Sequence, residues 1–397
     1  MKTVILLSLC IISAVYGESK IKGEVLPPGG AICNTLLGSK KIWFYIAPKY
    51  QIRNLTGQNH TLDLQASFPY TYALSAGLKA PQDSTRPLGK GLYVRTESFP
   101  YFYAPYYMNR GRAAAYVTLP ALFGWRLKLT VRDELAVTWL IDTTQWKALD
   151  QQALVSDLNS ISEHPLYPRK EHAPSLTLSG YMDTRDNALN PGRGFFWSMA
   201  IGHHRVYELV TGYRYWYNQF GSTVRVYARP GKRHVLAMQY KSVIRDRFDA
   251  VNLSHRLIYH DDDAHFRGFY LLCGENMKYT NMEYRFRLFP ISKGAHTWPP
   301  FNRSKLINRF LKHSIELFTF VDNGLFWGTT YAGKWEDIRI TWRNFGDHLY
   351  TSAGGGIRAV LPALNWVASA GVIPYHRKIG LHEDYKLYYY VSHNIYF

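Results

Sequence analysis

The sequence is poor in cysteine and, after its first residues, has no long apolar run. Only three of its 397 residues are cysteine, which excludes a scaffold held together by many disulfides. Beyond the N-terminal segment, no stretch reaches the roughly 18 uninterrupted apolar residues that a membrane-spanning helix needs. A glycine-rich loop followed by Lys and Ser or Thr, which would cradle phosphates, is also missing. These absences exclude a disulfide-rich scaffold, a bundle of membrane helices and a P-loop nucleotide site.

Aromatic residues, in contrast, are abundant. They make up 16% of the chain, with 31 Tyr and 11 Trp, although the mean hydropathy is slightly polar at −0.24. A transmembrane β-barrel explains this combination, because half of each strand faces lipid, half faces a polar lumen, and aromatic girdles mark both interfaces. The composition therefore predicts an all-β fold, an antiparallel transmembrane barrel over residues 41–397.

Acidic residues are scarce relative to basic ones. The chain has 29 Asp and Glu against 47 Lys and Arg, which gives a formal net charge of +18. The cations are scattered singly along strand-like segments and turns, as at Arg205, Arg214 and Arg225. Nucleic-acid binding usually needs a clustered basic surface, so nucleic acid is not expected as a partner. The pattern favours a positive lumen and basic rims, with outer-membrane lipid and lipopolysaccharide phosphates as candidate partners.

The N-terminus has the pattern of a secretory signal peptide. Lys2 provides the positive charge, residues 4–15 the short apolar stretch and Gly17 a small residue for cleavage, so we expect residues 1–17 to be removed. Removal would leave Cys33 and Cys273, either as one disulfide or as two thiols. Residues 18–40 are rich in Gly and Pro and are expected to form a short segment before the barrel, either disordered or tucked into the lumen.

Two later segments alternate between polar and apolar residues. In residues 279–289, Glu283 and Arg285 fall on one face and Met282 and Tyr284 on the other. In residues 315–322, Glu316 and Asp322 share a face. Because successive side chains of a strand point to opposite faces, both segments are predicted strands with charged side chains directed into the lumen.

The remaining elements are predicted less sharply. Residues 132–134 are expected to turn a hairpin between strands, and residues 146–161 have helical spacing. The last strand ends on Phe397, an aromatic terminus that is typical of Gram-negative outer-membrane barrels. Further strands are expected at residues 42–52, 61–74, 91–97, 113–119, 125–131, 135–141, 176–183, 207–217, 223–228 and 234–243.

Five motifs, taken together and in order, resemble the outer membrane protein 85 superfamily, also called the bacterial surface antigen or BamA/TamA-type barrels. Residues 41–175 fit this family only in length and general pattern. The motifs are a turn with Asp183, Arg185, Asp186 and Asn187 followed by Pro191, Gly192 and Gly194; a loop with Phe266, Arg267, Gly268 and Phe269; a strand with Glu283, Arg285, Phe289 and Pro290; a strand with Phe320, Asp322 and Gly324; and a strand with Ser352, Gly354, Gly356, Arg358 and Pro362.

The resemblance implies a barrel of sixteen strands whose sixth extracellular loop folds inward. In such a barrel Arg267 pairs with inward carboxylates, and the matching positions here are Glu283 and Asp322. Family members that insert or secrete proteins carry periplasmic POTRA domains before the barrel, whereas only about 20 residues precede the first expected strand after the signal peptide. The resemblance therefore implies a short form without these domains.

No enzyme chemistry is expected. His260 and His265 flank three aspartates, but adjacent carboxylates do not converge on one ion without a bent loop. We interpret this run as a solvated turn and expect no metal and no cofactor. The leading hypothesis is a non-enzymatic outer-membrane barrel in envelope biogenesis that assists insertion or translocation of protein or lipid, with a periplasmic or outer-membrane protein as partner. The alternatives are a passive, anion-preferring pore and a membrane scaffold for another protein.

Overall fold

The fold is known from a computed structural model, and it consists almost entirely of β-strands. The structure describes residues 22–32, 44–53, 60–69, 72–80, 88–100, 106–120, 124–140, 169–187, 190–210, 212–246, 273–289, 314–331, 335–341, 343–361, 366–378 and 388–393. The strands are β1 (Lys22–Ile32), β2 (Phe44–Arg53), β3 (Thr61–Pro69), β4 (Tyr72–Ala80), β5 (Gly89–Pro100), β6 (Tyr106–Pro120), β7 (Arg126–Leu140), β8 (Arg169–His172), β9 (Ser175–Asp183), β10 (Gly194–Glu208), β11 (Arg214–Gly231), β12 (His234–Arg245), β13 (Cys273–Phe289), β14 (Ser314–Tyr331), β15 (Trp335–Ile338), β16 (Leu349–Leu361), β17 (Trp366–Lys378) and β18 (Tyr388–His393). A short 3-10 helix, η4 (Phe345–His348), precedes β16.

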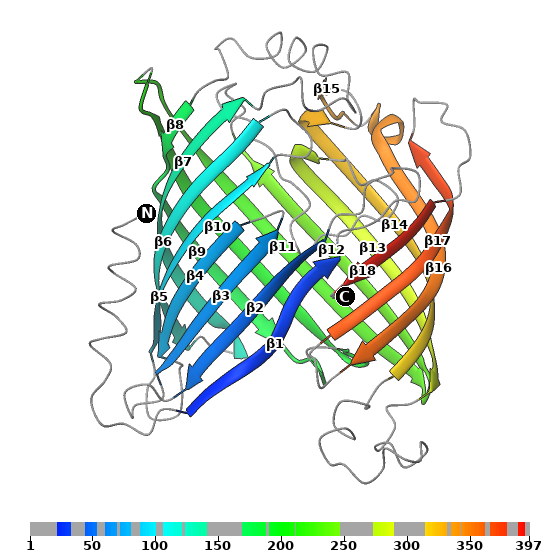
Figure 1. The fold of residues 1–397 in the computed structure, drawn as a ribbon. Coiled ribbons are helices and arrows are strands. Elements are labelled where there is room, and N and C mark those ends of the chain that lie inside the picture. The colour runs from blue at the N-terminus through cyan, green and yellow to red at the C-terminus, as the bar shows by residue number, and fades with distance from the viewer. Residues whose placement is uncertain are drawn as a thin grey trace.

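All 18 strands belong to one sheet, which curls into a barrel (Figure 1). The strand pairings of the described residues are antiparallel and join strands that are near neighbours along the chain. Two short strands, β8 and β15, pair with the same neighbours as the strands that follow them. β8 and β9 both pair with β7 and β10, and β15 and β16 both pair with β14. β1 contacts β18, so the first and last strands lie side by side.

The two ends of the barrel differ in their connections. Residues 184–193, 232–233 and 362–365 are short connections at one end, which we call the turn end. Residues 141–168 and 246–272 are long connections at the opposite end, which we call the loop end. The division has exceptions: residues 290–313 are a long connection at the turn end, and residues 70–71, 101–105 and 209–213 are short connections at the loop end. Outer-membrane barrels have short periplasmic turns and longer extracellular loops, so this asymmetry gives the barrel a direction.

The inner and outer faces of the sheet have opposite chemistry. Side chains along several of the described strands alternate between buried and exposed, as in β14, where residues 316, 318, 320 and 322 are buried and residues 317, 319 and 321 are exposed. Soluble proteins place their charges outside, and this barrel does the reverse. The buried set includes Glu97, Glu134, Glu171, Glu208, Arg225, Glu283, Arg285, Glu316, Asp322 and Arg358. The exposed set includes Leu74, Leu92, Val117, Leu129, Val131, Leu176, Leu178, Ile201, Val226, Leu236, Leu317 and Ile357.

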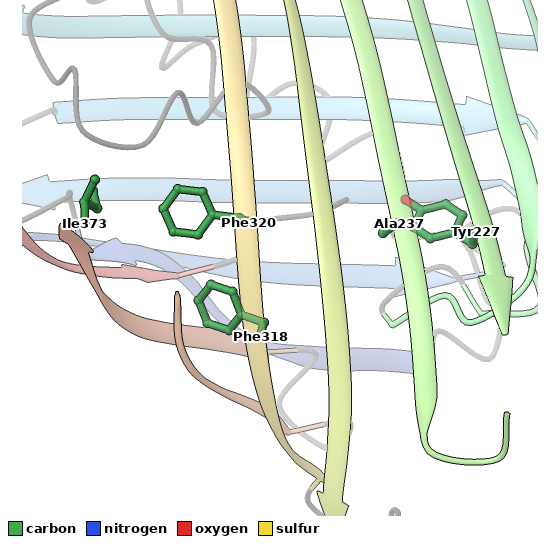
Figure 2. Close-up of a cluster of buried hydrophobic side chains, with 5 residues drawn as sticks. All are labelled: Tyr227, Ala237, Phe318, Phe320 and Ile373. Carbon is green, nitrogen blue, oxygen red and sulfur yellow. The ribbon is translucent and has the colours of Figure 1, made fainter. Parts of the chain in front are cut away.

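Figure 2 shows a small cluster of buried apolar side chains. It contains Tyr227, Ala237, Phe318, Phe320 and Ile373, which come from four different strands. Its centre depends on small residues of β16. A Cβ atom on Gly354 would lie 2.9 Å from the ring of Phe320 and would also collide with the backbone of β17. The glycine therefore leaves the space that this aromatic ring needs.

The all-β antiparallel barrel is confirmed, and four of the expected boundaries are wrong. Residues 207–217 are not one strand, because β10 ends at Glu208 and β11 begins at Arg214. Residues 132–134 do not turn, because β7 runs through them and the Glu134 carboxylate binds Arg112 of β6 at 2.7 Å. Residues 61–74 contain two strands, β3 and β4, because β3 ends at Pro69, which has no N–H for the ladder. The segment 18–40 is not outside the sheet, because β1 pairs with β2 from Lys22 to Ile32.

Other expectations are not decided by the described residues. Residues 146–161, the predicted helix, and the terminal Phe397 lie outside them. The strand count of sixteen stays a prediction, since β8 and β15 are only 4 residues long and share neighbours with β9 and β16. Within the described part of the chain, no helix has the length and apolar character needed to cross a membrane.

Candidate functional site in the barrel lumen

The candidate site is a network of charged side chains on the inner face of β13, β14 and β16. The ladder register places Arg287, Glu316 and Arg358 next to one another in one row across these strands. Glu283 and Arg285 are inward residues of β13 in the rows beside it. Inward positions of a strand are two residues apart, and this spacing alone brings five charged groups onto one patch of the wall.

Glu316 is the centre of this network. Its carboxylate accepts a hydrogen bond from Nε of Arg287 at 2.9 Å, and Nε of Arg358 lies 3.8 Å away. A third contact comes from outside the wall, where Nδ2 of Asn190 donates to Oε1 of Glu316 at 2.9 Å. Glu316 is 0% exposed. The two hydrogen bonds to its Oε1 atom replace water there, whereas Oε2 has the longer 3.8 Å contact with Arg358.

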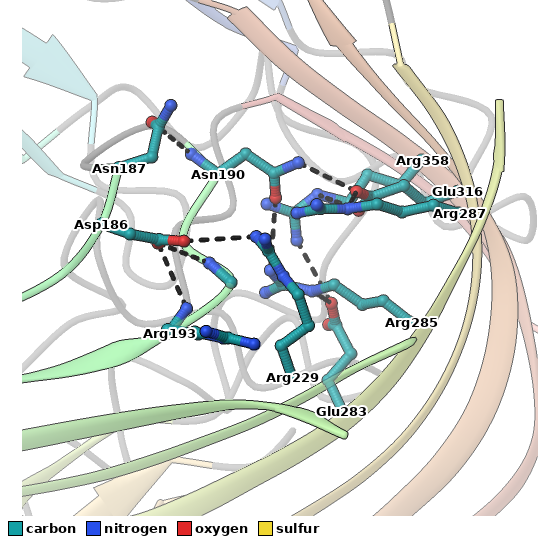
Figure 3. A network of polar contacts seen from close by, with 11 residues as sticks. Asp186, Asn187, Asn190, Arg193, Arg229, Glu283, Arg285, Arg287, Glu316 and Arg358 are labelled. Carbon is teal, nitrogen blue, oxygen red and sulfur yellow. Dashed lines mark hydrogen bonds and ion pairs between the residues drawn. The ribbon is translucent and has the colours of Figure 1, made fainter. Parts of the chain in front are cut away.

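Glu283 holds a second pair of arginines. Its Oε1 atom accepts from Nε of Arg285 at 2.5 Å and from Nη1 of Arg358 at 3.2 Å. Arg358 therefore bridges Glu283 and Glu316, and the two carboxylates and three arginines form one continuous set (Figure 3). Isolated charges in such a place are costly, whereas mutually paired charges are tolerated.

The turn between β9 and β10 reaches into this network. Nη1 of Arg285 donates to Oδ1 of Asn190 at 3.4 Å, so the side-chain amide of Asn190 bridges Arg285 and Glu316. The backbone N–H of Asn190 in turn donates to Oδ1 of Asn187 at 3.1 Å. Figure 3 shows Asn187 and Asn190 on the turn, facing the charged wall. The turn thereby closes over the wall at the turn end of the barrel.

Two aspartates shape the turn itself. Asp183 pairs with Arg185 at 2.7 Å. Asp186 accepts from the backbone N–H groups of Gly192 and Arg193 at 2.8 and 3.2 Å, and Arg229 lies 3.2 Å from its other oxygen. Burial alone would raise the pKa of Asp186, but these hydrogen bonds and the nearby arginines outweigh burial and hold its pKa below the ordinary value.

Gly194 ends the turn with a backbone that other residues rarely adopt. Its φ is 100°, and an added Cβ would collide with the carbonyl of Thr184. The backbone N–H of Thr184 donates to the carbonyl of Phe195 at 2.8 Å, which fixes the close approach. Glycine is therefore required at this position for both reasons.

The structure places the sequence-predicted residues in part. Glu283 and Asp322 are both buried, on the inner faces of β13 and β14, and the four residues of the turn motif lie in one turn. The loop residues Phe266, Arg267, Gly268 and Phe269 lie outside the described residues. The pairing of Arg267 with Glu283 and Asp322 therefore stays a prediction.

Sequence reasoning missed a second charged network on β5, β6 and β7. Glu97 pairs with Arg95, Arg110 and Arg112, and Glu134 pairs with Arg112 and Arg110. The signal was present, because Arg95 and Glu97, like Arg110 and Arg112, are two residues apart and so share a face. The prediction of a turn at residues 132–134 hid the partner on β7.

Both networks are suited to holding a wall and a turn in place rather than to bond chemistry. Each carboxylate in them is paired with arginines. Within the described ranges, no group of three or more His, Cys, Asp or Glu side chains is arranged to hold a metal ion.

Comparison with known proteins gives a fold and no sequence family. No model of a protein family matches the sequence, and no curated protein matches it. The structure is similar to BamA from Haemophilus ducreyi lacking POTRA domains 1–3, with a TM-score of 0.61 and 12% identity, over 94% of this chain and 70% of that chain.

Two further similar structures are CdiB proteins. CdiB from Acinetobacter baumannii has a TM-score of 0.56 and 12% identity, over 94% of this chain and 60% of that chain. CdiB from Escherichia coli has a TM-score of 0.53 and 11% identity, over 95% of this chain and 68% of that chain. At such identities the likeness shows that the chain has the fold of these barrels.

Proposed function

We propose that this chain is a non-enzymatic outer-membrane barrel of the outer membrane protein 85 superfamily that acts in envelope biogenesis by assisting the insertion or translocation of protein or lipid. One observation carries the proposal: a charged lumen and an apolar outer face occur on a fold similar to those of BamA and CdiB. The five motifs that resemble the family are a second support.

The outer face is suited to a lipid environment. Leu127, Leu129 and Val131 follow one another at outward positions of β7, at 37%, 43% and 56% exposure. Leu176 and Leu178 continue this surface on β9. Water would penalise such a surface, with roughly 25 cal/mol for each Å² of apolar area left exposed. A bilayer removes the penalty, and closing the sheet satisfies the backbone polar groups that lipid does not hydrate.

The contact between the first and last strands provides a route for incoming strands. The described part of β18 has only 6 residues, against 13 in its neighbour β17 and 11 in β1. Such a route requires the contact between β1 and β18 to open. An opened sheet edge exposes unpaired N–H and C=O groups that can template a strand of a client protein.

Reconstitution tests this function directly. The purified protein is placed in liposomes, and the folding of a small outer-membrane barrel is followed by its altered migration on an unheated gel. We expect faster folding than in empty liposomes, and liposomes carrying the same protein in unfolded form serve as the matched control. Equal rates in all three preparations, with the folded protein present, would contradict the insertase function.

A passive pore with anion preference is the second candidate. Inward cations on β11 and β12 favour it, with Arg225 and Lys241 both 8% exposed on the lumen side. The same burial counts against a wide channel along β13 to β16, since Arg285, Glu316 and Asp322 are all 0% exposed. Planar-bilayer recordings distinguish the two: a steady anion-selective current supports the pore, and an absent or irregular current supports the packed lumen.

A further inference from the structure

A cluster of exposed cations lies on the outer face of the barrel at its loop end. Lys170 of β8, Arg205 of β10 and Arg214 of β11 are all exposed. Glu171 and Val206, which follow Lys170 and Arg205, are buried on the inner side. Tyr217, three residues after Arg214 and so on the opposite face of the strand, is buried there as well. The three cations therefore occupy outward positions. Within the part of the chain that the structure describes, none of the three cations forms an ion pair with a carboxylate, in contrast to the arginines of the lumen.

The sheet register brings these cations close together. Tyr207 is the cross-strand partner of both His172 and Arg214, and the backbone N–H of Leu209 donates to the carbonyl of Lys170 at 2.7 Å. Three adjacent strands are therefore involved. Because neighbouring strands lie about 5 Å apart, the cations extend over roughly 10 Å across the sheet. Along the strands, Lys170 lies beside Leu209 and so four residues from Arg205, which is about 14 Å. A single ligand that contacts all three cations must therefore span about 14 Å or more.

Aromatic rings fill the space between the cations. His172 stacks on Tyr207 with ring centroids 5.9 Å apart, and His203 lies 5.6 Å from the ring of Trp216. Arg214 is 5.8 Å from the ring centroid of Tyr207. Aromatic rings with a polar atom favour the boundary between lipid chains and water. We call Lys170, His172, Arg205, Tyr207, Arg214 and Trp216 the β8–β11 patch.

The acidic groups beside the patch already have partners. A carboxylate oxygen of Asp133 lies 2.6 Å from Nε2 of His172. Asp246 accepts from the side-chain amide of Asn218 at 2.6 Å and from its backbone N–H at 2.8 Å. The three cations are thus the groups of the patch that remain available to an external anion.

An apolar surface continues from the patch toward the middle of the barrel. Leu176, Ile201 and Phe220 are outward residues of β9, β10 and β11, at 49%, 56% and 43% exposure. Their register partners lie along neighbouring strands. A molecule that binds the cations with an anionic head can lay hydrocarbon chains on this surface. The combination indicates an amphipathic anion rather than a free one.

We infer that the β8–β11 patch binds the phosphorylated sugar headgroup of a glycolipid of the lipid A class, and this inference rests on the proposed outer-membrane location. The loop end carries the long connections 141–168 and 246–272, which are the mark of the external side of such barrels. Phosphate pairs with Arg and Lys through charge-assisted hydrogen bonds, and sugar rings stack on Tyr, Trp and His. The patch offers both kinds of contact at the level where that headgroup lies.

Binding of defined lipids to the full chain in detergent micelles tests the inference, with native mass spectrometry as the readout. The probes are bisphosphorylated lipid A, its dephosphorylated form and phosphatidylglycerol. The variant replaces Lys170, Arg205 and Arg214 by Gln. The control variant replaces Lys90, Lys232 and Arg233 by Gln, which removes the same charge from exposed positions at the turn end. Both are first checked for folding by heat-modifiable gel migration.

We expect bisphosphorylated lipid A to bind the unmodified chain and the control variant alike. The patch variant should bind it about tenfold to a hundredfold more weakly, as expected for the loss of three cations near a membrane surface. If the triple variant does not fold, Arg214→Gln alone, at an exposed position, is measured in its place. Its expected loss is smaller and in the same direction.

Three results would overturn the inference: equal binding by the patch and control variants, equal binding of the dephosphorylated lipid, or phosphatidylglycerol bound as tightly through the same residues. The liposome folding assay contains no lipid A. Its failure would remove the insertase function and leave the lipid-binding result intact, so the two proposals are separately testable.

Discussion

Replacement of Glu316 by Gln tests whether the lumen network stabilises the barrel. The wall holds three arginines and two glutamates, Arg285, Arg287, Arg358, Glu283 and Glu316. Its net charge of three minus two is +1, and the substitution raises it to +2. Glu316 is 0% exposed, so water does not compensate for the lost charge. Removing one partner of a buried ion pair costs about 3–5 kcal/mol of the free energy of unfolding.

The measurement is a urea titration of the detergent-folded protein, followed by tryptophan fluorescence and by gel migration without heating. Asp347→Asn is the matched control, because Asp347 is exposed in η4 and surface changes usually stay within about 0.5 kcal/mol. Adding Arg287→Gln to Glu316→Gln restores the net charge to +1. The double variant should therefore lose less stability than the sum of its single changes, with a coupling of about 0.5–3 kcal/mol.

Two results would refute this reasoning. The first is a cost for Glu316→Gln that is no larger than for Asp347→Asn. The second is strict additivity of Arg287→Gln and Glu316→Gln, since independent residues add and contacting residues do not. Either result would mean that the 2.9 Å contact between Arg287 and Glu316 contributes nothing measurable.

Four other predictions concern the turn and the loop. Asn190→Ala should cost about 1–3 kcal/mol, because it removes the hydrogen bonds that the Asn190 amide makes to buried Glu316 and Arg285. Limited proteolysis should then cut residues 184–193 faster, and unchanged cleavage would contradict the prediction. Gly194→Ala should lower the unfolding midpoint by an amount equivalent to about 1–3 kcal/mol, because φ is 100° there; an unchanged urea midpoint would count against the strain. The pKa of Asp186 is lower in the folded protein than in the unfolded chain, where it is about 3.9. The ionised carboxylate therefore stabilises the folded state fully above the unfolded pKa. This stabilisation is lost as the pH falls through the folded pKa. Urea midpoints between about pH 6 and pH 3 should therefore fall more in the parent than in Asp186→Asn, and parallel curves would exclude the effect. Arg267→Ala should loosen the predicted inward loop and leave the barrel folded, which external protease would report as faster loop cleavage in cells.

The lumen contacts show which part of the site the sequence could predict. The side-chain direction of Glu283, Arg285 and Glu316 follows from their positions along a strand, because successive residues alternate between faces. Their partners do not follow from it. Asn190 and Glu316 are 126 residues apart, and only the closure of the barrel brings them within 2.9 Å.

The wrong boundaries have separate physical causes. Residues 132–134 are three consecutive charges, and such runs are usually solvated turns in soluble proteins. In a barrel with a polar lumen, Glu134 finds Arg112 on the next strand at 2.7 Å, so a charged residue is well placed inside a strand. Residues 22–32 are rich in Gly and Pro, which weaken a strand by themselves, and their pairing with β2 outweighs this preference.

The sequence by itself determined the fold class and the chemistry of each face of the sheet. Alternation, aromatic content and the lack of long apolar runs are local properties, and a strand keeps them wherever it is placed. The tertiary structure alone decided which charges meet, that the turn bearing Asn190 closes over Glu316, and that three cations of separate strands form one external patch. These facts depend on strand register and barrel closure, which bring together residues that are distant along the chain.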